Sequence, residues 1–139
     1  MKPHLSFHNL EKVIHTFITS WLDYCNSLYL GLPKSLLSRL QLVKNSAARL
    51  LTGSRKRDHI TPILASLHWL PILHRIHFKT LLMVLKALNG LAPPYITELI
   101  HRHSAPRSLR SCSMGLLNVP RTRLKQRGDR AFDVAAPRL

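Results

Sequence analysis

The sequence predicts a mainly α-helical protein, a small bundle of about four to five helices with a basic, partly irregular C-terminal extension. Leucine accounts for 27 of the 139 residues, against 13 valines and isoleucines, which favours helix over strand. The 5 glycines are isolated, as helix caps and turns require. Apolar residues recur at three- and four-residue spacing, and an apolar content of 45% is enough for the core of about one domain.

The first predicted helix covers residues 9–29. Its apolar face is expected to point into the core, so that Cys25 is a buried, inert thiol. Gly31 suits the left-handed position that often follows a helix end, and Pro33 suits the first turn of the next helix. The apolar face consists of Leu10, Val13, Ile14, Phe17, Ile18, Trp21, Tyr24, Cys25 and Leu28.

A second helix is expected over residues 33–52, with Gly53 at its end. The short turn between the first two helices predicts that they pack as a hairpin. A basic turn follows at residues 54–59, and Thr61 and Pro62 mark the start of a short helix over residues 62–68. The apolar face of the second helix consists of Leu36, Leu40, Val43, Ala47, Leu50 and Leu51.

A third long helix is predicted over residues 71–88, closed by Asn89 and Gly90. The bases Arg75, Lys79 and Lys86 fall within a stripe of roughly 40° around the helix axis. Nearly all the remaining circumference is apolar, so we expect a mostly buried helix with one solvated edge. His77 and Phe78 lie in the apolar arc, where a hydrogen-bonded core histidine is the expected structural role.

The composition changes after a shorter predicted helix over residues 95–103. Residues 101–139 carry a net charge of +7, and we place a domain boundary near Ser104, between a helical domain (1–103) and a basic extension (104–139). Within the extension every second residue is basic at Arg121, Arg123, Lys125 and Arg127, which an extended strand would align on one side. A short helix with Ala131, Phe132 and Val134 is expected after Gly128.

The net charge of +15 and pI near 11.2 predict an anionic partner. Cys25 and Cys112 form no disulfide framework or C-x-x-C pair, and the N-terminus lacks a signal-peptide apolar region. The longest apolar run, residues 81–85, is far too short to span a membrane. We therefore expect an intracellular protein, with nucleus and cytoplasm both left open.

The sequence predicts no catalytic site, cofactor or metal ion. Its 6 acidic residues are scattered, whereas two-metal phosphoryl transfer needs clustered carboxylates. The closest pair, Asp129 and Asp133, is expected to pair with Arg130 or Lys125 at a helix end. There is no glycine-rich phosphate loop, and the 9 histidines lack the companions that a zinc site needs.

Basic clusters are the remaining candidate site, because each neutralised phosphate releases counterions and adds affinity for RNA or DNA. Phe17, Trp21, Tyr24 and Phe78 are assigned to core faces, which leaves few aromatic side chains for base stacking. A helical protein-protein module, self-associating through apolar faces, and a basic membrane-surface binder are the alternatives. The candidate nucleic-acid-binding residues are Arg55, Lys56, Arg57, Arg75, Lys79, Lys86, Arg121, Arg123, Lys125 and Arg127.

Seven ordered sequence blocks resemble the region that follows the reverse transcriptase domain in jockey-like retrotransposons without long terminal repeats. Any single block is weak, but seven in the same order are hard to produce by chance. The blocks are residues 22–28 (LDYCNSL), 31–33 (GLP), 40–43 (LQLV) with Asn45, 47–53 (AARLLTG), 67–71 (LHWLP), 86–93 (KALNGLAP) and 119–123 (VPRTR).

The resemblance implies thumb-like, post-polymerase helices that lie against a template and nascent duplex. The family's polymerase motif, an aromatic and a further residue followed by two aspartates, does not occur here. The resemblance therefore implies a non-catalytic piece, and the end of the sequence inside a family block implies a truncated element copy. Relatives often have arginine where Trp21 stands and aspartate where His77 stands, which puts an acid-arginine pair at those positions in doubt.

Overall fold

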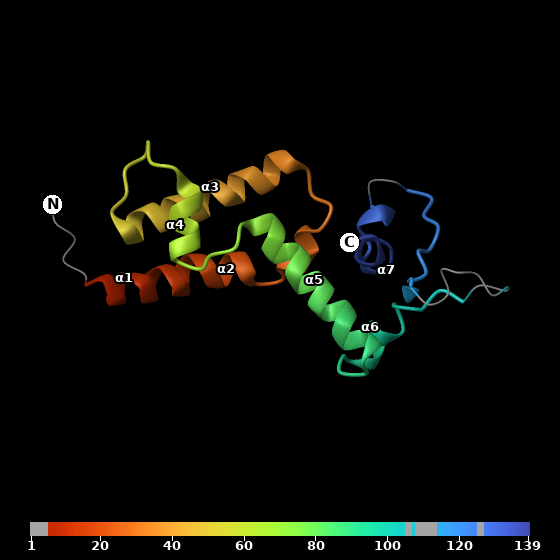
Figure 1. The fold of residues 1–139 in the computed structure, drawn as a ribbon. Coiled ribbons are helices and arrows are strands. Elements are labelled where there is room, and N and C mark those ends of the chain that lie inside the picture. Colours follow the sequence, from red (N-terminus) through yellow and green to blue (C-terminus); the bar gives the residue numbers. More distant parts are fainter. Residues whose placement is uncertain (1–5, 105–106, 108–113, 125–126) are drawn as a thin grey trace. The chain divides into compact units, whose positions relative to one another are not determined.

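The structure is a computed structural model that describes residues 6–104, 107, 114–124 and 127–139 (Figure 1). It is mainly helical, as predicted; within the described residues, β-pairing is limited to a single antiparallel bridge between Arg102 and Leu117. The principal helices are α1 (Phe7–Ile14), α2 (Ser20–Asp23), α3 (Lys34–Thr52), α4 (Ile60–Ser66), α5 (Ile72–Leu88), α6 (Pro94–Thr97) and α7 (Phe132–Ala135).

The chain forms two compact units, Met1–Ile76 and His77–Leu139, which divide within α5. The sequence predicts a boundary near Ser104, where the composition changes. The two packing units of the structure divide after Ile76 instead. In the second unit Val84 and Ala87 of α5 share a core with Ile100 and with Ala136 from the C-terminal end. The last part of the basic extension is therefore built into the same core as α5.

The first predicted helix is interrupted and ends early. Ser6 caps α1 by accepting a hydrogen bond from the Asn9 N–H. A π-helical turn, η1 (His15–Thr19), follows, in which the Ser20 N–H donates to the carbonyl of His15. α2 ends at Asp23, because Tyr24 is extended and Cys25 adopts a left-handed conformation with φ of 50°. The continuous helix expected to residue 29 is wrong; residues 26–29 instead form the 3₁₀ turn η2 (Asn26–Tyr29).

The π turn changes which side chains reach the core. It holds one residue more than an α-turn, so the residues after it are rotated back around the axis. Leu22 and Asn26 take the inner positions expected for Trp21 and Cys25. The core assignment of Phe17, Trp21 and Tyr24 is wrong, because these side chains are 69%, 74% and 75% exposed, and Cys25 is exposed rather than buried.

Helix α3 agrees closely with its prediction, and the hairpin with the first helical segment is confirmed. Gly53 has φ of 66° and ends the helix with its N–H bonded to the carbonyl of Arg49, a conformation that glycine adopts without steric cost. Ala47 and Leu51 of α3 pack with Ile14 of α1. Leu10, Ile18, Leu67 and Trp69 complete this core of the first unit.

Helix α5 buries one narrow stripe, so the prediction of a mostly buried helix is wrong. Ile72, Ile76, Thr80, Val84 and Ala87 are buried at spacings of four and three residues. His77 is half-buried at the edge of the stripe rather than in the core. Exposed apolar residues cover much of the remaining surface, namely Leu73, Phe78, Leu81, Leu82 and Leu85.

The second unit is completed by short segments. α6 ends at Thr97, well before the predicted end at residue 103. The His103 N–H donates to Leu116 O at 2.7 Å and the Asn118 N–H donates to His101 O at 2.8 Å. These two hydrogen bonds flank the isolated bridge between Arg102 and Leu117. The helix expected after Gly128 is present as α7, preceded by the 3₁₀ turn η4 (Gly128–Arg130) and followed by η5 (Ala136–Arg138). Val134 of α7 is fully buried.

None of the helices in the part of the chain that the structure describes is both long and apolar enough to cross a lipid bilayer.

Candidate nucleic-acid interface

The basic turn between α3 and α4 has a defined conformation. The Asp58 carboxylate accepts a hydrogen bond from the Arg55 N–H at 2.7 Å, and the Asp58 N–H donates to Arg55 O at 3.1 Å. From the end of α3, Arg49 donates to Arg55 O at 3.2 Å and to Asp58 O at 2.8 Å. Arg49 therefore holds both ends of the turn.

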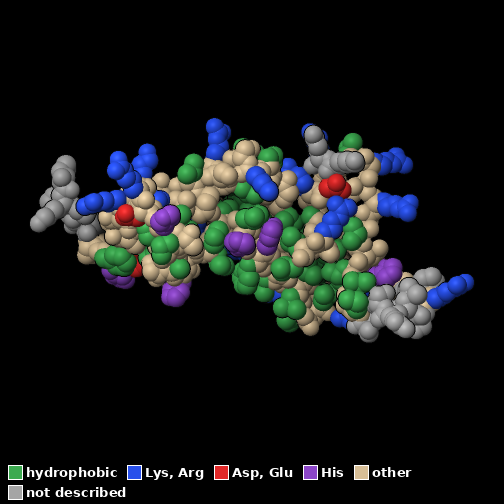
Figure 2. Space-filling model, turned by 45° about the horizontal axis from the view of Figure 1, so that its top comes forward, with side chains coloured by type: hydrophobic (Ala, Val, Ile, Leu, Met, Phe, Trp, Pro, Cys, Tyr) green, Lys and Arg blue, Asp and Glu red, His purple; other side chains and the backbone are tan. Residues whose placement is uncertain are grey.

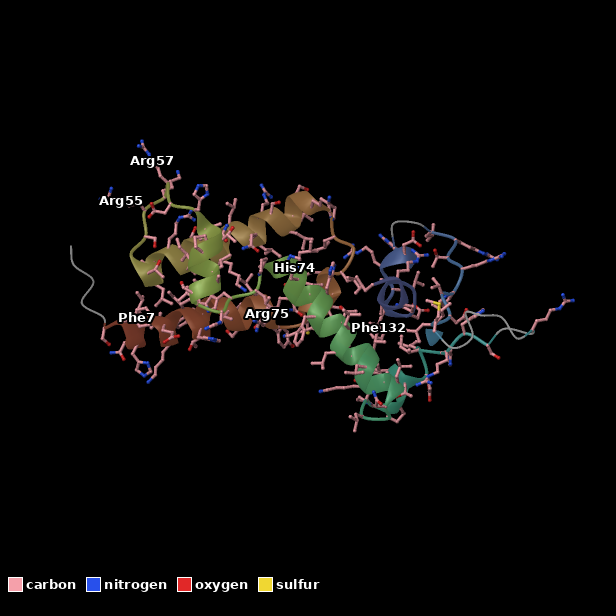
Figure 3. All side chains as sticks on the ribbon, viewed as in Figure 1. Phe7, Arg55, Arg57, His74, Arg75 and Phe132 are labelled. Carbon is pink, nitrogen blue, oxygen red and sulfur yellow. The ribbon has the colours of Figure 1, made fainter. Side chains whose placement is uncertain are left out.

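This arrangement leaves the three charged side chains at the tip of the turn free to meet a ligand. Arg55, Lys56 and Arg57 are all exposed, and Figure 3 shows Arg55 and Arg57 projecting from the loop into solvent. Their backbone is fixed by hydrogen bonds, so little backbone freedom is lost on binding. The guanidinium groups can bind phosphate oxygens through paired N–H donors, and the ammonium group acts as a point charge.

The predicted basic stripe on α5 is not assembled as expected. Arg75 forms an ion pair with Asp23 of α2 and is about two-thirds buried. Lys79 is half-buried and has its own interaction partner, whereas Lys86 is exposed. The expectation of three equivalent solvated bases is therefore wrong, because the acid that pairs with Arg75 comes from a segment 52 residues away in sequence.

The structure describes three of the four alternating bases of the C-terminal extension, and these three do not lie on one straight strand. The Gly128 N–H donates to Leu124 O at 2.8 Å, so Arg127 does not continue an extended strand with Arg121 and Arg123. The side chains of these three arginines are exposed, and the predicted position of Lys125 lies outside the described residues.

A local network holds Gly128 and Asp129 close to Thr122. The Thr122 hydroxyl donates to Asp129 Oδ1 at 2.7 Å, and Arg138 forms an ion pair with the same oxygen at 3.3 Å. A Cβ atom at Gly128 would lie 2.8 Å from the Thr122 Cβ, so only glycine fits there. Asp129, predicted to pair with Arg130 or Lys125, thus has Arg138 as an ion-pair partner.

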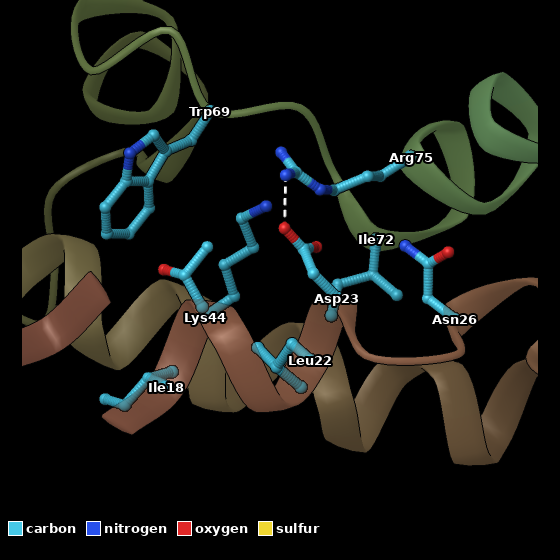
Figure 4. A pocket seen from close by; sticks show the side chains of 9 residues that line it. Ile18, Leu22, Asp23, Asn26, Lys44, Trp69, Ile72 and Arg75 are labelled. Carbon is cyan, nitrogen blue, oxygen red and sulfur yellow. Dashed lines mark hydrogen bonds and ion pairs between the residues drawn. The ribbon is translucent and has the colours of Figure 1, made fainter. Parts of the chain in front are cut away.

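Sequence reasoning missed a small polar pocket in the first unit (Figure 4). Asp23 and Arg75 form their ion pair on one side of it, and Lys44 of α3 points in from another. Lys44 Nζ donates to Leu70 O at 2.6 Å and lies 5.8 Å from the centre of the Trp69 ring. The one available signal was the helical wheel of α3, which places Lys44 close to the buried Ala47, Ala48 and Leu51.

The pocket perturbs Lys44 electrostatically. Burial, and next the positive charge of Arg75, lower the pKa of Lys44 below its ordinary value of 10.5, while Asp23 opposes the shift. Asn26 Oδ1 and Arg75 Nε are buried without hydrogen-bond partners. These features are more typical of a structural polar cluster than of a ligand site, because the ion pair and the Lys44 hydrogen bond already occupy most of the charged groups.

Lys and Arg greatly outnumber acidic side chains on the molecular face drawn in Figure 2. In the part of the chain that the structure describes, no three His, Cys, Asp or Glu side chains converge as a metal site requires. No protein-family model matches the chain, and the searches of curated proteins and of solved structures give no match.

Proposed function

We propose that this protein is a non-catalytic, nucleic-acid-binding fragment related to the region that follows the polymerase of jockey-like retrotransposons. The seven ordered sequence blocks support the relationship. Two of them, which are far apart in the chain, supply residues that line the polar pocket, Asp23 and Trp69, and Lys44 of the same pocket lies beside a third block. Sequence blocks that meet around one structural cluster are what a shared fold requires, and this supports reading them together.

The observation that carries the binding proposal is the basic turn held by Arg49 and Asp58. It fixes the backbone of Arg55, Lys56 and Arg57 while leaving their side chains exposed. Contacts of this kind go to the phosphate backbone and carry no base-sequence information. The expected ligand is RNA or DNA, bound with weak sequence dependence and with strong sensitivity to salt.

The sequence supports a non-enzymatic role. The two adjacent aspartates of the family's polymerase motif are missing from the chain. Its six acids lie at positions 11, 23, 58, 98, 129 and 133, too dispersed along the sequence for the carboxylate clusters that hold two metal ions. We therefore assign the chain a binding role and no catalytic residue.

The salt dependence of binding tests the role of the basic turn. Replacing Arg55, Lys56 and Arg57 with glutamine removes up to three phosphate contacts. The slope of log affinity against log salt should fall by roughly 2 to 3 units, because each contact contributes about 0.7 to 0.9 of a unit. The measurement is a titration of labelled RNA with the full chain at several salt concentrations.

A matched control separates local contacts from net charge. Lys12, Lys34 and Arg39 are exposed bases elsewhere in the same unit, and their replacement with glutamine makes the same change in charge. This control should lower the slope by less than the turn variant. Equal effects would show that the turn is an ordinary part of a diffuse positive field, and no binding by the wild type at low salt would refute the function.

The contribution of the C-terminal extension to binding is tested with point substitutions, because a truncation would also disturb the core. Removing the chain after His103 would also remove Ala136 and Phe132, which pack on Val84 and Ala87. Glutamine at Arg121, Arg123, Lys125 and Arg127 leaves that core intact and should reduce the salt slope by up to roughly 3 to 4 units. A full slope in this variant would remove the extension from the interface.

A protein-protein module is the second candidate, favoured by the exposed apolar side chains of α5. Phe78, Leu81 and Leu85 recur at spacings of three and four residues on the surface of the second unit, which is the pattern of a helix-packing face. This candidate predicts concentration-dependent self-association in sedimentation experiments, abolished by Leu81→Glu. A monomer at all accessible concentrations would exclude self-association through this face.

A further inference from the structure

We infer that the nucleic acid bound by this protein is single-stranded and that its bases stack on Phe17, Trp21 and Tyr24. This inference rests on the proposed function and adds the class of ligand. Side chains of this kind normally supply the largest apolar contributions to a protein core. Here each of the three is more than two-thirds exposed, within eight residues of the first unit.

The backbone produces this exposure. The π-helical turn displaces the helix register by one residue, so Leu22 takes an inner position and lines the polar pocket while Trp21 faces solvent. Tyr24 follows the end of α2 in an extended conformation. π-Helical turns are frequent at functional sites, and this one directs an aromatic side chain outward where a regular helix would direct it inward.

The spacing of the side chains suits separated bases. Trp21 follows Phe17 by four positions and Tyr24 follows Trp21 by three, so the three exposed rings leave the backbone at successive points along η1, α2 and the residue after α2. A single strand with unstacked bases can place one base on each ring. A duplex cannot do so, because its bases are already stacked on one another.

The positive net charge of this protein favours a nucleic acid, rather than a second copy of this chain, as the partner of the exposed aromatic side chains. Residues 1–76 contain ten Lys or Arg and three Asp or Glu, a net charge of +7, and the whole chain carries +15. Like charge opposes self-association, whereas a polyanion is attracted. Single-stranded nucleic acid combines that negative charge with the π-faces that exposed aromatic side chains bind.

Substitution of Trp21 tests the stacking directly. Trp21→Leu keeps an apolar side chain but removes the π-face, and it should weaken binding of a single-stranded RNA 20-mer by about five- to tenfold. Trp21→Phe should stay close to wild type. The salt slope should be the same in all three proteins, because no charge changes. Inorganic polyphosphate, which lacks bases, should bind all three equally.

The control is Leu42→Ala on α3, where the leucine is 64% exposed; it should leave RNA binding unchanged. A second measurement uses the difference in tryptophan emission between wild type and Trp21→Phe. This difference is the emission of Trp21. Single-stranded RNA should quench this emission, whereas polyphosphate should not. Circular dichroism of each variant checks that the fold is retained.

Three results would overturn the inference. Trp21→Leu could bind RNA as tightly as wild type while the basic-turn variant binds weakly; the proposed function would then stand and the stacking would fall. Alternatively, Trp21→Leu could dissociate a dimer without changing RNA affinity, and the aromatic surface would then be a protein contact. If the wild type binds no nucleic acid, both the function and this inference fail together.

Discussion

At the scale of single residues, the polar pocket shows how charge is accommodated inside the first unit. Arg75 and Asp23 have side chains 32% and 19% exposed, between a solvated surface pair and a fully buried one. Lys44 places a second positive charge nearby and satisfies it with the carbonyl of Leu70 and the face of Trp69. The pocket joins α2, α3 and the start of α5, so its residues position those elements.

We predict a measurable coupling energy between Asp23 and Arg75. Exposed ion pairs contribute about 0 to 1 kcal/mol and the loss of one partner from a buried pair costs about 3 to 5 kcal/mol. For this partly exposed pair, a double-mutant cycle with Asp23→Asn and Arg75→Met should give roughly 1 to 2 kcal/mol. The measurement is the urea dependence of unfolding for the four proteins, and strictly additive effects would contradict the prediction.

Lys44 should make stability depend on pH. Its pKa is lower in the folded state than in the unfolded chain, so the folded protein binds fewer protons between the two values. The free energy of unfolding therefore rises with pH through the folded pKa and levels off above the unfolded value near 10.5. We expect wild type to gain stability relative to Lys44→Met between pH 7 and 10, measured by urea unfolding. A difference that stays constant over this range would disprove the linkage.

At the scale of elements, the π turn η1 decides the surface of the first helical segment. In a regular helix, residues seven positions apart lie on the same face, whereas residues eight positions apart are rotated by roughly 80° from each other. Ile14 and Leu22 are eight positions apart, so a regular helix could not direct both of them into the core. The extra residue in η1 brings Ile14 and Leu22 onto the same face of the segment. Its cost is poorer hydrogen-bond geometry in one turn. The same shift directs Trp21 outward.

Deletion of one residue tests this account. Removing Thr16, an exposed residue within η1 whose hydroxyl bonds to Lys12 O, should restore a regular helix with Ile14 and Leu22 in phase. We expect the free energy of unfolding to change by less than about 1 kcal/mol, which lies within the usual range for surface changes.

The matched control is removal of Ser46, an exposed residue of α3 whose hydroxyl bonds to Leu42 O in the same way. This deletion rotates the rest of α3 by roughly 100° and takes Ala47, Ala48 and Leu51 out of the core. It should cost about 3 kcal/mol or more. If both deletions destabilise the chain equally, the idea that η1 contains one extra residue relative to a regular helix is wrong.

At the scale of the whole molecule, charge and packing act against each other. The net charge of +15 attracts polyanions but opposes compaction through self-repulsion. Each of the two units has a small core, and many apolar side chains remain exposed. A bound polyanion would relieve the repulsion, so nucleic acid should both bind and stabilise the chain.

We predict that the purified protein has no polymerase activity on primed RNA or DNA with any divalent metal. The reason is the missing pair of adjacent aspartates, without which two catalytic metal ions have no ligands. The assay measures incorporation of labelled nucleotides, with an active reverse transcriptase as positive control. Template-dependent extension that persists in a contaminant-free sample would disprove the non-catalytic assignment.

The sequence alone determined the helical class and the features that depend on local chemistry. The leucine-rich three- and four-residue periodicity fixed α3 almost to the residue, Gly53 marked its end, and the basic turn was recognised from three adjacent charges. Such features depend on neighbouring residues, whose propensities and caps act over a few positions. The predicted family relationship, nucleic-acid binding and lack of catalysis also come from the sequence and remain proposals.

Only the tertiary structure decided which face of each segment is buried and which charges are paired. Asp23 and Arg75 meet across 52 residues, the Gly128 N–H bonds to Leu124 O, and one extra residue in η1 moves Trp21 from the predicted core to the surface. A helical wheel assumes a constant rotation per residue and has no knowledge of the partner segment. Burial and ion pairing are instead set by contacts between distant parts of the chain, so they could not be obtained from local sequence patterns.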